Sequence, residues 1–576
     1  MRTLLPGLLA ALLLVTGCTS LPVEGPVELG EASTPSGASA PFDFNPPGPR
    51  PGATPEQVVG GFLQALQATP PTLRVAHEFL TEEAVADWRP DRRTIVYTSQ
   101  SSSAGAGVVR VELEDAFELD EHGRYVGARE AASPPLTFQV VREDDEWRIA
   151  SLPDAMVIPR SHFQARYLPF SLYFFDPTGS VLVPEQVHLP RGVQAPTLLV
   201  AGLLAGPTVA AQGVERSYLP AGTRLGVSVP VGSDGLAEVQ LTPEIRELPQ
   251  DQLERAVAQL AWTLRQVGQV QRFEITVDGT PVELPGGPTV EVEEMAEYAP
   301  SVAAASTDLF GLRRRQVVQV VGNEEKTAVP LAVAFHYRSL GIDLPGAWFA
   351  LVTRDGSAVD VVSREGVESA RRSYTGTDVL RPMWDHTGRT WLVDRTPTGP
   401  QVVLVEKHGV RTLPAPGLAD ERVLGASLSR DGTRLALTVR GDGDGVSRLL
   451  MARVVRRDGG QPVRLAGLVE LATPAPLDGG RDLGWRDPTT VAVLTRPTES
   501  TSQVMLASID GSSGSVGPVT PTDVLFDAGV ALAASPGDPM ALVVRTRSGG
   551  LHALDLQGRW DFDAGEPGLR APAFVG

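Results

Sequence analysis

The sequence predicts a multidomain protein in which two α+β domains are followed by an all-β propeller of about five or more blades. Three observations lead to this prediction. The chain has 576 residues, more than one hydrophobic core can organise. Helical and alternating apolar patterns are mixed up to about residue 292. A degenerate strand–turn–strand pattern then recurs from about residue 340 to the end.

The amino-terminal segment has the layout of a secretory signal peptide that ends at a cysteine. Arg2 is positive, residues 8–15 are almost entirely apolar, and Val15-Thr16-Gly17-Cys18 closes the segment. Such a stretch is too short to span a bilayer. It resembles a bacterial lipobox, which implies a signal peptide at 1–17 and lipidation of Cys18 by a diacylglyceryl group and an N-acyl chain. The alternative is an ordinary secreted protein with one cysteine in its signal.

Composition restricts the possible partners and chemistry. Cys18 is the only cysteine, so once it is acylated no disulfide, thiolate metal site or cysteine nucleophile can form. The net charge of −19 argues against nucleic acid and against electrostatic adhesion to anionic lipid. We therefore expect attachment to the membrane through the acyl chains alone.

Residues 18–53 are predicted to hold the lipidated cysteine and a flexible tether. This segment is rich in Pro, Gly, Ser and Ala and buries too little apolar surface to fold. The first domain, at 54–155, opens with a capping box at Thr54-Pro55-Glu56-Gln57 that has proline at the first helical position. A second short helix is expected around residues 75–79.

Strands follow in the first domain. Alternating patterns predict them at 94–97, 108–113, 136–141 and 147–152. Two helices and a curved antiparallel sheet are typical of an NTF2-like α+β domain, a fold that hosts many functions. A connector at 156–194 follows, with a strand at 171–175 and a turn at Pro177-Thr178-Gly179. Its aromatic cluster, Leu172-Tyr173-Phe174-Phe175, is expected to pack against a neighbouring domain, with ligand binding as the alternative.

A second α+β domain is predicted at 195–292. Its expected helices are 198–204 and a longer one from Asp251 to Gly268, and its expected strands are 224–229, 237–241 and 272–277, with a hairpin turn at Asp278-Gly279. Pro220-Ala221-Gly222-Thr223, residues 259–264 and Val277-Asp278-Gly279 resemble, in this order, the GerMN domain of the spore-germination protein GerM.

Residues 293–339 are predicted to be a linker, and residues 340–576 a β-propeller. Each repeat consists of a strand, a polar turn and a second apolar strand, and the copies begin at 384, 428, 485 and 533. Residues 348–362 are expected to belong to an earlier blade. At roughly 45 residues per blade, this region holds about five blades.

No catalytic, cofactor-binding or metal-binding constellation stands out. The eight histidines, at 77, 122, 162, 188, 336, 386, 408 and 552, include no pair at metal-ligand spacing. Residues 441–445 look like the start of a calcium loop, but Arg453 stands where the twelfth-position glutamate belongs, so a hairpin turn is favoured. Gly388-Arg389-Thr390-Trp391 resembles half of a sialidase Asp-box, which is a structural turn, and the carboxylates at 143–146 indicate a solvated turn. We expect no enzyme.

The order of these modules resembles the LpqB lipoproteins of actinobacteria. Besides the module order, the resemblance rests on Leu172-Tyr173-Phe174-Phe175-Asp176-Pro177, Leu182-Val183-Pro184 and residues 259–264. It implies a lipoprotein on the extracytoplasmic face of the cell membrane that contacts the extracytoplasmic domain of the sensor kinase MtrB. That contact would modulate the MtrA–MtrB two-component system, which affects cell-wall metabolism and division.

Two other functions stay open at this point. GerMN-like modules occur in proteins linked to peptidoglycan, so a cell-wall binding lipoprotein without a kinase partner is the first alternative. A propeller hydrolase is the second, although the sequence lacks an acid–base constellation to support it.

Overall fold

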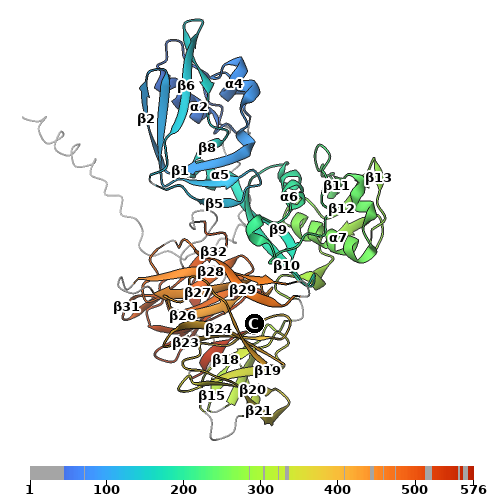
Figure 1. Ribbon diagram of the computed structural model, residues 1–576, viewed down its shortest axis with the longest axis vertical. Helices are drawn as coiled ribbons and strands as arrows, with labels where there is room; N and C mark the ends of the chain where they lie inside the picture. The colour runs from blue at the N-terminus through green and yellow to red at the C-terminus, as the bar shows by residue number, and fades with distance from the viewer. Residues whose placement is uncertain are drawn as a thin grey trace, which may run out of the picture.

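A computed structural model shows three domains that meet at one junction (Figure 1). The N-terminal α+β domain lies at the top, the second α+β domain at its side, and the propeller below both. The structure describes residues 44–576 except 70–71, 131, 285, 303–304, 315, 322–323, 331–335, 408, 441–445, 458–459, 474, 513–521, 555–557 and 562–567. Cys18 and most of the predicted tether therefore lie outside the described residues.

The N-terminal domain begins with the predicted capped helix. Helix α2 spans Pro55–Ala65, and the backbone N–H of Gln57 donates to Thr54 Oγ1 while the Thr54 N–H donates to the Gln57 side chain. This reciprocal pair satisfies two orphan donors of the first turn, so the capping box is confirmed. The remaining helices of this domain are α3 (Arg74–His77), α4 (Glu82–Asp87) and α5 (Arg160–Arg166).

Removing this cap should destabilise the N-terminal domain modestly. Thr54→Ala leaves the Gln57 N–H without its acceptor, and we expect a loss of about 1 kcal/mol in the free energy of unfolding. Urea denaturation followed by circular dichroism measures this loss. Gln64→Ala, on the exposed face of the same helix, is the matched control and should change stability by only a few tenths of a kcal/mol.

The strands of this domain form two four-stranded sheets rather than the single curved sheet expected. One sheet has the order β2-β3-β6-β7 and the other β5-β4-β1-β8. The strands are β1 (Arg93–Tyr97), β2 (Ser99–Gly105), β3 (Val108–Glu114), β4 (Phe117–Asp120), β5 (Tyr125–Ala128), β6 (Leu136–Glu143), β7 (Glu146–Ser151) and β8 (Met156–Pro159). The carboxylates at 143–146 form the β6–β7 turn, as predicted. Strands β1 and β8 are parallel, which sequence alternation cannot reveal.

The predicted connector at 156–194 is structured and divided between two domains. Strand β8 and helix α5 complete the N-terminal domain, where Phe163 lies in the core. Strands β9 (Tyr167–Phe175) and β10 (Leu182–Pro190) form an antiparallel hairpin whose apolar residues join the core of the second domain. The expected packing of the aromatic cluster is confirmed, because Phe174 and Phe175 are fully buried.

The second domain covers this hairpin with two helices. Its further elements are α6 (Ala195–Leu204), α7 (Gln250–Leu264), β11 (Leu236–Gln240), β12 (Arg272–Val277), β13 (Thr280–Pro281) and β14 (Thr289–Glu291). Short 3₁₀ turns lie at Pro90–Arg92 in the first domain and at Val209–Ala211, Pro243–Glu247 and Ala296–Tyr298.

The strand expected at 224–229 is wrong. Only an isolated bridge joins Leu225 to Leu241, and the Val229 N–H donates to the Thr197 side chain instead of to a strand. The Gly226 N–H still donates to the Gln240 carbonyl, so the segment runs beside β11. Pro230, which has no N–H, cannot donate to a longer ladder.

Within the described residues, the propeller has six blades. They are β15–β17 with β37 (Leu309–Arg313, Gln316–Val321, Glu324–Pro330, Arg570–Ala573), β18–β21 (Tyr337–Ile342, Trp348–Thr353, Ala358–Ser363, Gly366–Thr375), β22–β25 (Met383–Trp384, Thr390–Thr396, Gly399–Glu406, Gly409–Leu413), β26–β29 (Arg422–Leu428, Arg434–Arg440, Ser447–Arg456, Pro462–Glu470), β30–β32 (Asp482–Asp487, Thr490–Thr498, Thr501–Ser508) and β33–β36 (Gly529–Ser535, Asp538–Thr546, Leu551–Leu554, Trp560–Asp561). The all-β propeller of five or more blades is thereby confirmed.

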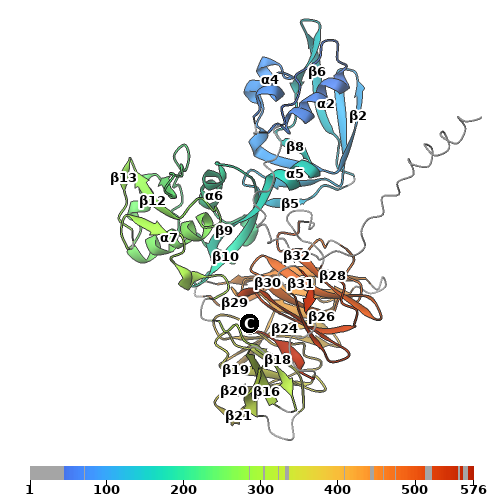
Figure 2. The same cartoon turned by 180° about the vertical axis from the view of Figure 1, so that it is seen from behind.

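The expected linker at 293–339 contains most of the first blade. Strands β15, β16 and β17 pair in sequence, and β37 from the end of the chain adds the innermost strand beside β15. The boundary predicted at 340 is therefore too late. The six innermost strands, β37, β18, β22, β26, β30 and β33, contact one another in a closed ring, and Figure 2 shows this body from behind.

Candidate functional site at the junction of the three domains

The β9–β10 hairpin is the structural centre of the molecule. Its nine residue pairs run from Tyr167–Pro190 to Phe175–Leu182, and one face packs on α7. The Gln259 side chain of α7, itself fully buried, donates to the Tyr173 carbonyl and accepts from the Tyr218 N–H. These bonds hold the hairpin to its own domain, while its turn and its β10 strand contact the other two domains.

The hairpin contacts the N-terminal domain through a buried arginine. Arg124 donates from Nε to Glu185 Oε2 at 3.0 Å and from Nη2 to the Gly206 carbonyl at 2.8 Å. The His188 N–H donates to the Gly123 carbonyl, where φ is +78° and a Cβ would lie 2.5 Å from the His188 oxygen. The close approach requires glycine, so the contact between the two domains depends on Gly123.

The same strand contacts the propeller through a histidine–aspartate pair. His188 Nε2 lies 2.7 Å from Asp510 Oδ2, and both side chains are buried. Burial alone would raise the pKa of Asp510, but the contact with His188 and the hydrogen bonds from Ser512 outweigh burial and lower it. Asp510 therefore keeps its charge inside the junction.

A second pair lies at the hairpin turn. Asp176 is fully buried, and its carboxylate accepts from Thr178, Ser180 and Val181 and lies 3.5 Å from His386 Nε2 of the propeller. Burial opposes ionisation of this carboxyl, yet these donors hold its pKa at about 2. Two histidines that the sequence indicated as surface or packing residues are therefore buried partners of aspartates from another domain.

The third contact is an ion pair between the second domain and the propeller. Arg434 donates from Nη2 to Glu215 Oε1 at 3.1 Å and to the Pro184 carbonyl at 2.8 Å. Glu215 is almost completely buried, and its Oε2 atom has no hydrogen-bond partner within the described residues. Burial raises the pKa of Glu215 to about 7, against the opposing effect of Arg434.

This shift makes the stability of the junction dependent on pH. Because the folded-state pKa of Glu215 lies above its ordinary value of 4.5, the folded protein binds more protons than the unfolded chain between these pH values. Stability from this group is complete below about pH 4.5 and is lost as the pH rises through about 7. We expect Glu215→Gln to flatten this part of the pH–stability curve, measured as urea midpoints from pH 4.5 to 8. An unchanged slope would contradict the assignment.

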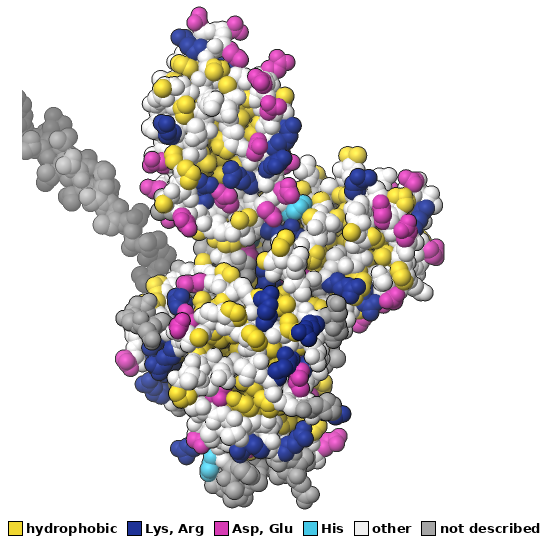
Figure 3. Space-filling model, viewed as in Figure 1, with side chains coloured by type: hydrophobic (Ala, Val, Ile, Leu, Met, Phe, Trp, Pro, Cys, Tyr) yellow, Lys and Arg dark blue, Asp and Glu magenta, His cyan; other side chains and the backbone are white. Residues whose placement is uncertain are grey.

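A cleft opens where the three domains meet. Its volume is about 860 Å³, and its walls come from β5 of the N-terminal domain, β10 of the second domain, and β28, β29 and the residues after β32 of the propeller. In Figure 3 the molecule narrows between the N-terminal domain and the propeller. The volume lies in the range of small-molecule sites.

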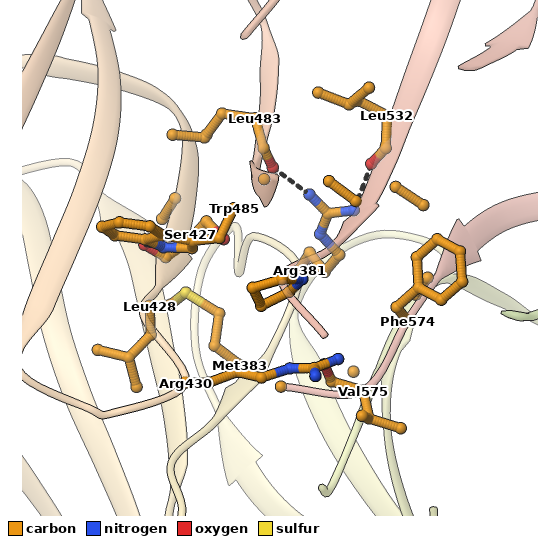
Figure 4. A pocket seen from close by; sticks show the side chains of 18 of the residues that line it. Arg381, Met383, Ser427, Leu428, Arg430, Leu483, Trp485, Leu532, Phe574 and Val575 are labelled. Atoms are coloured by element: carbon orange, nitrogen blue, oxygen red, sulfur yellow. Dashed lines mark hydrogen bonds between the residues drawn. The ribbon is translucent and has the colours of Figure 1, made fainter. Parts of the chain in front are cut away.

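The propeller channel, by contrast, is filled. Arg381 donates to the carbonyls of Leu483 and Leu532, both at 2.9 Å (Figure 4). Arg430 donates to the Val575 carbonyl and to Ser535 Oγ. The remaining cavity is about 50 Å³, room for a water molecule or two. Burial lowers the pKa of Arg430 to about 10. Protein side chains therefore occupy most of the space between the inner strands at this cavity.

The predicted lipidation site Cys18 lies outside the described residues, and so do His408 and the predicted hairpin turn at 441–445. In the described part of the chain, no group of three His, Cys, Asp or Glu side chains lies close enough to hold a metal ion. No helix there is both long enough and apolar enough to cross a bilayer.

The fold and the junction define the class of protein: two α+β domains joined to the rim of a six-bladed propeller by buried polar contacts. Family models match the chain in the same order, as "Lipoprotein LpqB, N-terminal domain" at 48–164, "Sporulation and spore germination" at 171–283 and "Lipoprotein LpqB beta-propeller domain" at 315–560. The chain belongs to the LpqB family of lipoproteins.

Full-length relatives agree with this assignment. The chain is 29% identical to Lipoprotein LpqB of Thermobifida fusca over 92% of either chain, and 27% identical to that of Mycolicibacterium smegmatis over 91% of this chain and 92% of that one. Among solved structures, the first GerMN domain of GerM from Bacillus subtilis is 21% identical, covers 21% of this chain and 91% of that chain, and overlays with a TM-score of 0.18.

Proposed function

We propose that this lipoprotein is anchored through acylated Cys18 to the extracytoplasmic face of the cell membrane. There it binds the extracytoplasmic domain of a sensor histidine kinase of the MtrB type and modulates the MtrA–MtrB two-component system, with effects on cell-wall metabolism and division. Membership of the LpqB family supports this proposal.

The observation that carries the proposal is the junction built on the β9–β10 hairpin. Buried polar contacts hold the three domains together, and in this proposal the three domains present one continuous surface to the kinase. A lipid anchor confines that surface to the membrane, where the local concentration of a membrane kinase is high, so a weak contact is sufficient. Modulation further requires that the lipoprotein bind two states of the kinase with different affinity.

Binding of peptidoglycan without a kinase partner is the second candidate function. The observation that favours it is the GerMN-type domain, since its family model is described as "Sporulation and spore germination", a process that remodels cell wall. In this case the same anchored platform would contact the wall polymer rather than a protein.

One titration separates the two functions. The chain from residue 19 onward contains every described residue and lacks the anchor, and calorimetry can follow its titration with the isolated kinase domain. Saturable binding supports the kinase proposal. Absence of binding by folded protein, together with sedimentation on purified cell wall that added kinase domain does not reduce, would support the second function instead.

A further inference from the structure

The junction cleft contains four carboxylates, and each of them already has a donor. Asp120 accepts from two backbone N–H groups, Glu185 from Arg124, Glu470 from Arg448 and Asp510 from His188. Two of the arginines that line the cleft are likewise engaged, since Arg124 bonds Glu185 and Arg434 bonds Glu215. The acids of the cleft are thus satisfied without a ligand.

Arg453 is the exception. It lines the cleft from β28, and its side chain makes no hydrogen bond or ion pair with any residue that the structure describes. It stands directly opposite Arg434 in the β27–β28 ladder, so two cations share one face while Glu215 bonds only Arg434. Burial and the charge of Arg434 lower the pKa of Arg453, and they outweigh the charges of Glu215 and Glu185, which raise it without forming an ion pair. Like charges directly opposite each other repel, and an added anion would relieve that repulsion.

The mouth of the cleft is apolar. Val126 of the N-terminal domain and Val469 of the propeller line it, and their side chains are 67% and 56% exposed. Met451 and Leu471 continue this apolar lining on the propeller side. Isolated exposed valines are ordinary, but here they lie on two walls of one cleft beside an unpaired cation.

From these observations we propose that the junction cleft binds a small amphiphile with one anionic head and an aliphatic body. The head, a carboxylate or a phosphate monoester, pairs with Arg453, and the body lies between Val126 and Val469. The inference rests on the residues that line the cleft and not on a contact with kinase or cell wall, so it stands whether or not the proposed function holds. Because the ligand contacts both the N-terminal domain and the propeller, its binding would stabilise their relative placement.

Calorimetry on the chain from residue 19 onward tests the site with three matched probes below their micelle concentrations: decanoate, decyl phosphate and decan-1-ol. We expect one molecule of decanoate or decyl phosphate to bind saturably per chain, and decan-1-ol to bind at least tenfold more weakly. The first two probes distinguish a carboxylate ligand from a phosphate ligand. Inorganic phosphate alone, which lacks the body, should bind at least tenfold more weakly than decyl phosphate.

Variants locate the binding. Arg453→Gln should weaken the better anion at least tenfold, while Arg371→Gln, an exposed arginine of another blade, should leave it unchanged. Val126→Asn changes a largely exposed residue on the opposite wall and should also weaken binding. It tests the proposal if Arg453→Gln does not fold. The proposal is overturned if neither alkyl anion binds saturably, if decan-1-ol binds as tightly as the anions, or if folded variants of Arg453 and Val126 bind like the parent protein.

Discussion

Deletion of residues 570–576 is expected to abolish cooperative folding of the propeller. The deletion removes β37, the innermost strand of the first blade, whose Ala573 pairs with Phe310. It also removes Phe574 and Val575, which are buried in two neighbouring core clusters, and the Gly576 N–H that donates to the Ile342 carbonyl. The lost burial alone is worth about 5 kcal/mol, before the cost of an open ring with unpaired strand edges is added.

Circular dichroism during urea denaturation, together with limited proteolysis, measures this effect. The expected result is an early, broad transition and rapid cleavage within residues 309–569. Arg570→Ala is the matched control, because Arg570 belongs to the same strand but is exposed, and it should behave like the parent protein. A single transition with an unchanged midpoint in the deleted protein would show that the ring does not depend on this closure.

Arg434→Met should destabilise the junction by about 3 kcal/mol or more. The substitution keeps an apolar side chain but leaves Glu215 as a buried charge without its cation and the Pro184 carbonyl without its donor. Because Arg434 lowers the pKa of Glu215, its removal raises that pKa further. The loss should therefore be largest above pH 7, where Glu215 must ionise, and smaller at pH 5, where it binds a proton.

A double variant tests whether the unpaired Glu215 carboxylate causes the stability loss of Arg434→Met. Arg434→Met combined with Glu215→Gln removes both charges, so the double variant should recover part of the stability that the single variant loses. Arg371→Met, at an exposed position, should change the unfolding free energy by only a few tenths of a kcal/mol. A double variant no more stable than Arg434→Met would show that the loss arises from packing rather than from the unpaired carboxylate.

The repeats that predicted the propeller could be recognised in the sequence because each blade has the same strand–turn–strand pattern. The copies that begin at 384, 428, 485 and 533 all start in the innermost strand of a blade and run through the turn to the next strand. In the first of them, Asp385 accepts from Thr387 and from Trp391 Nε1, which closes the turn. The first blade escaped notice because its innermost strand comes from the other end of the chain, so it has no contiguous repeat to recognise.

The candidate site was much less accessible to sequence analysis. The motif Leu182-Val183-Pro184 supported the family resemblance, but nothing in its pattern placed it between three domains. His188 and His386 have no metal-ligand spacing, and their aspartate partners lie in other domains. Arg453 was noticed only because it replaces a glutamate in a calcium-loop pattern. The one local signal that could have marked the hairpin is its near-continuous apolar character, which indicates burial on both faces.

By itself, the sequence determined the module order, the capped first helix, the principal helices, the blade repeats and the family. These features depend on periodicity and on interactions between residues close in the chain, which a sequence displays directly. Only the tertiary structure decided the number of blades, the division of the 156–194 segment and the junction. The pairs that build the junction are 219 residues apart for Glu215 and Arg434 and 322 apart for His188 and Asp510. Their burial, and with it their charge and pKa, exists only once the three domains have packed together.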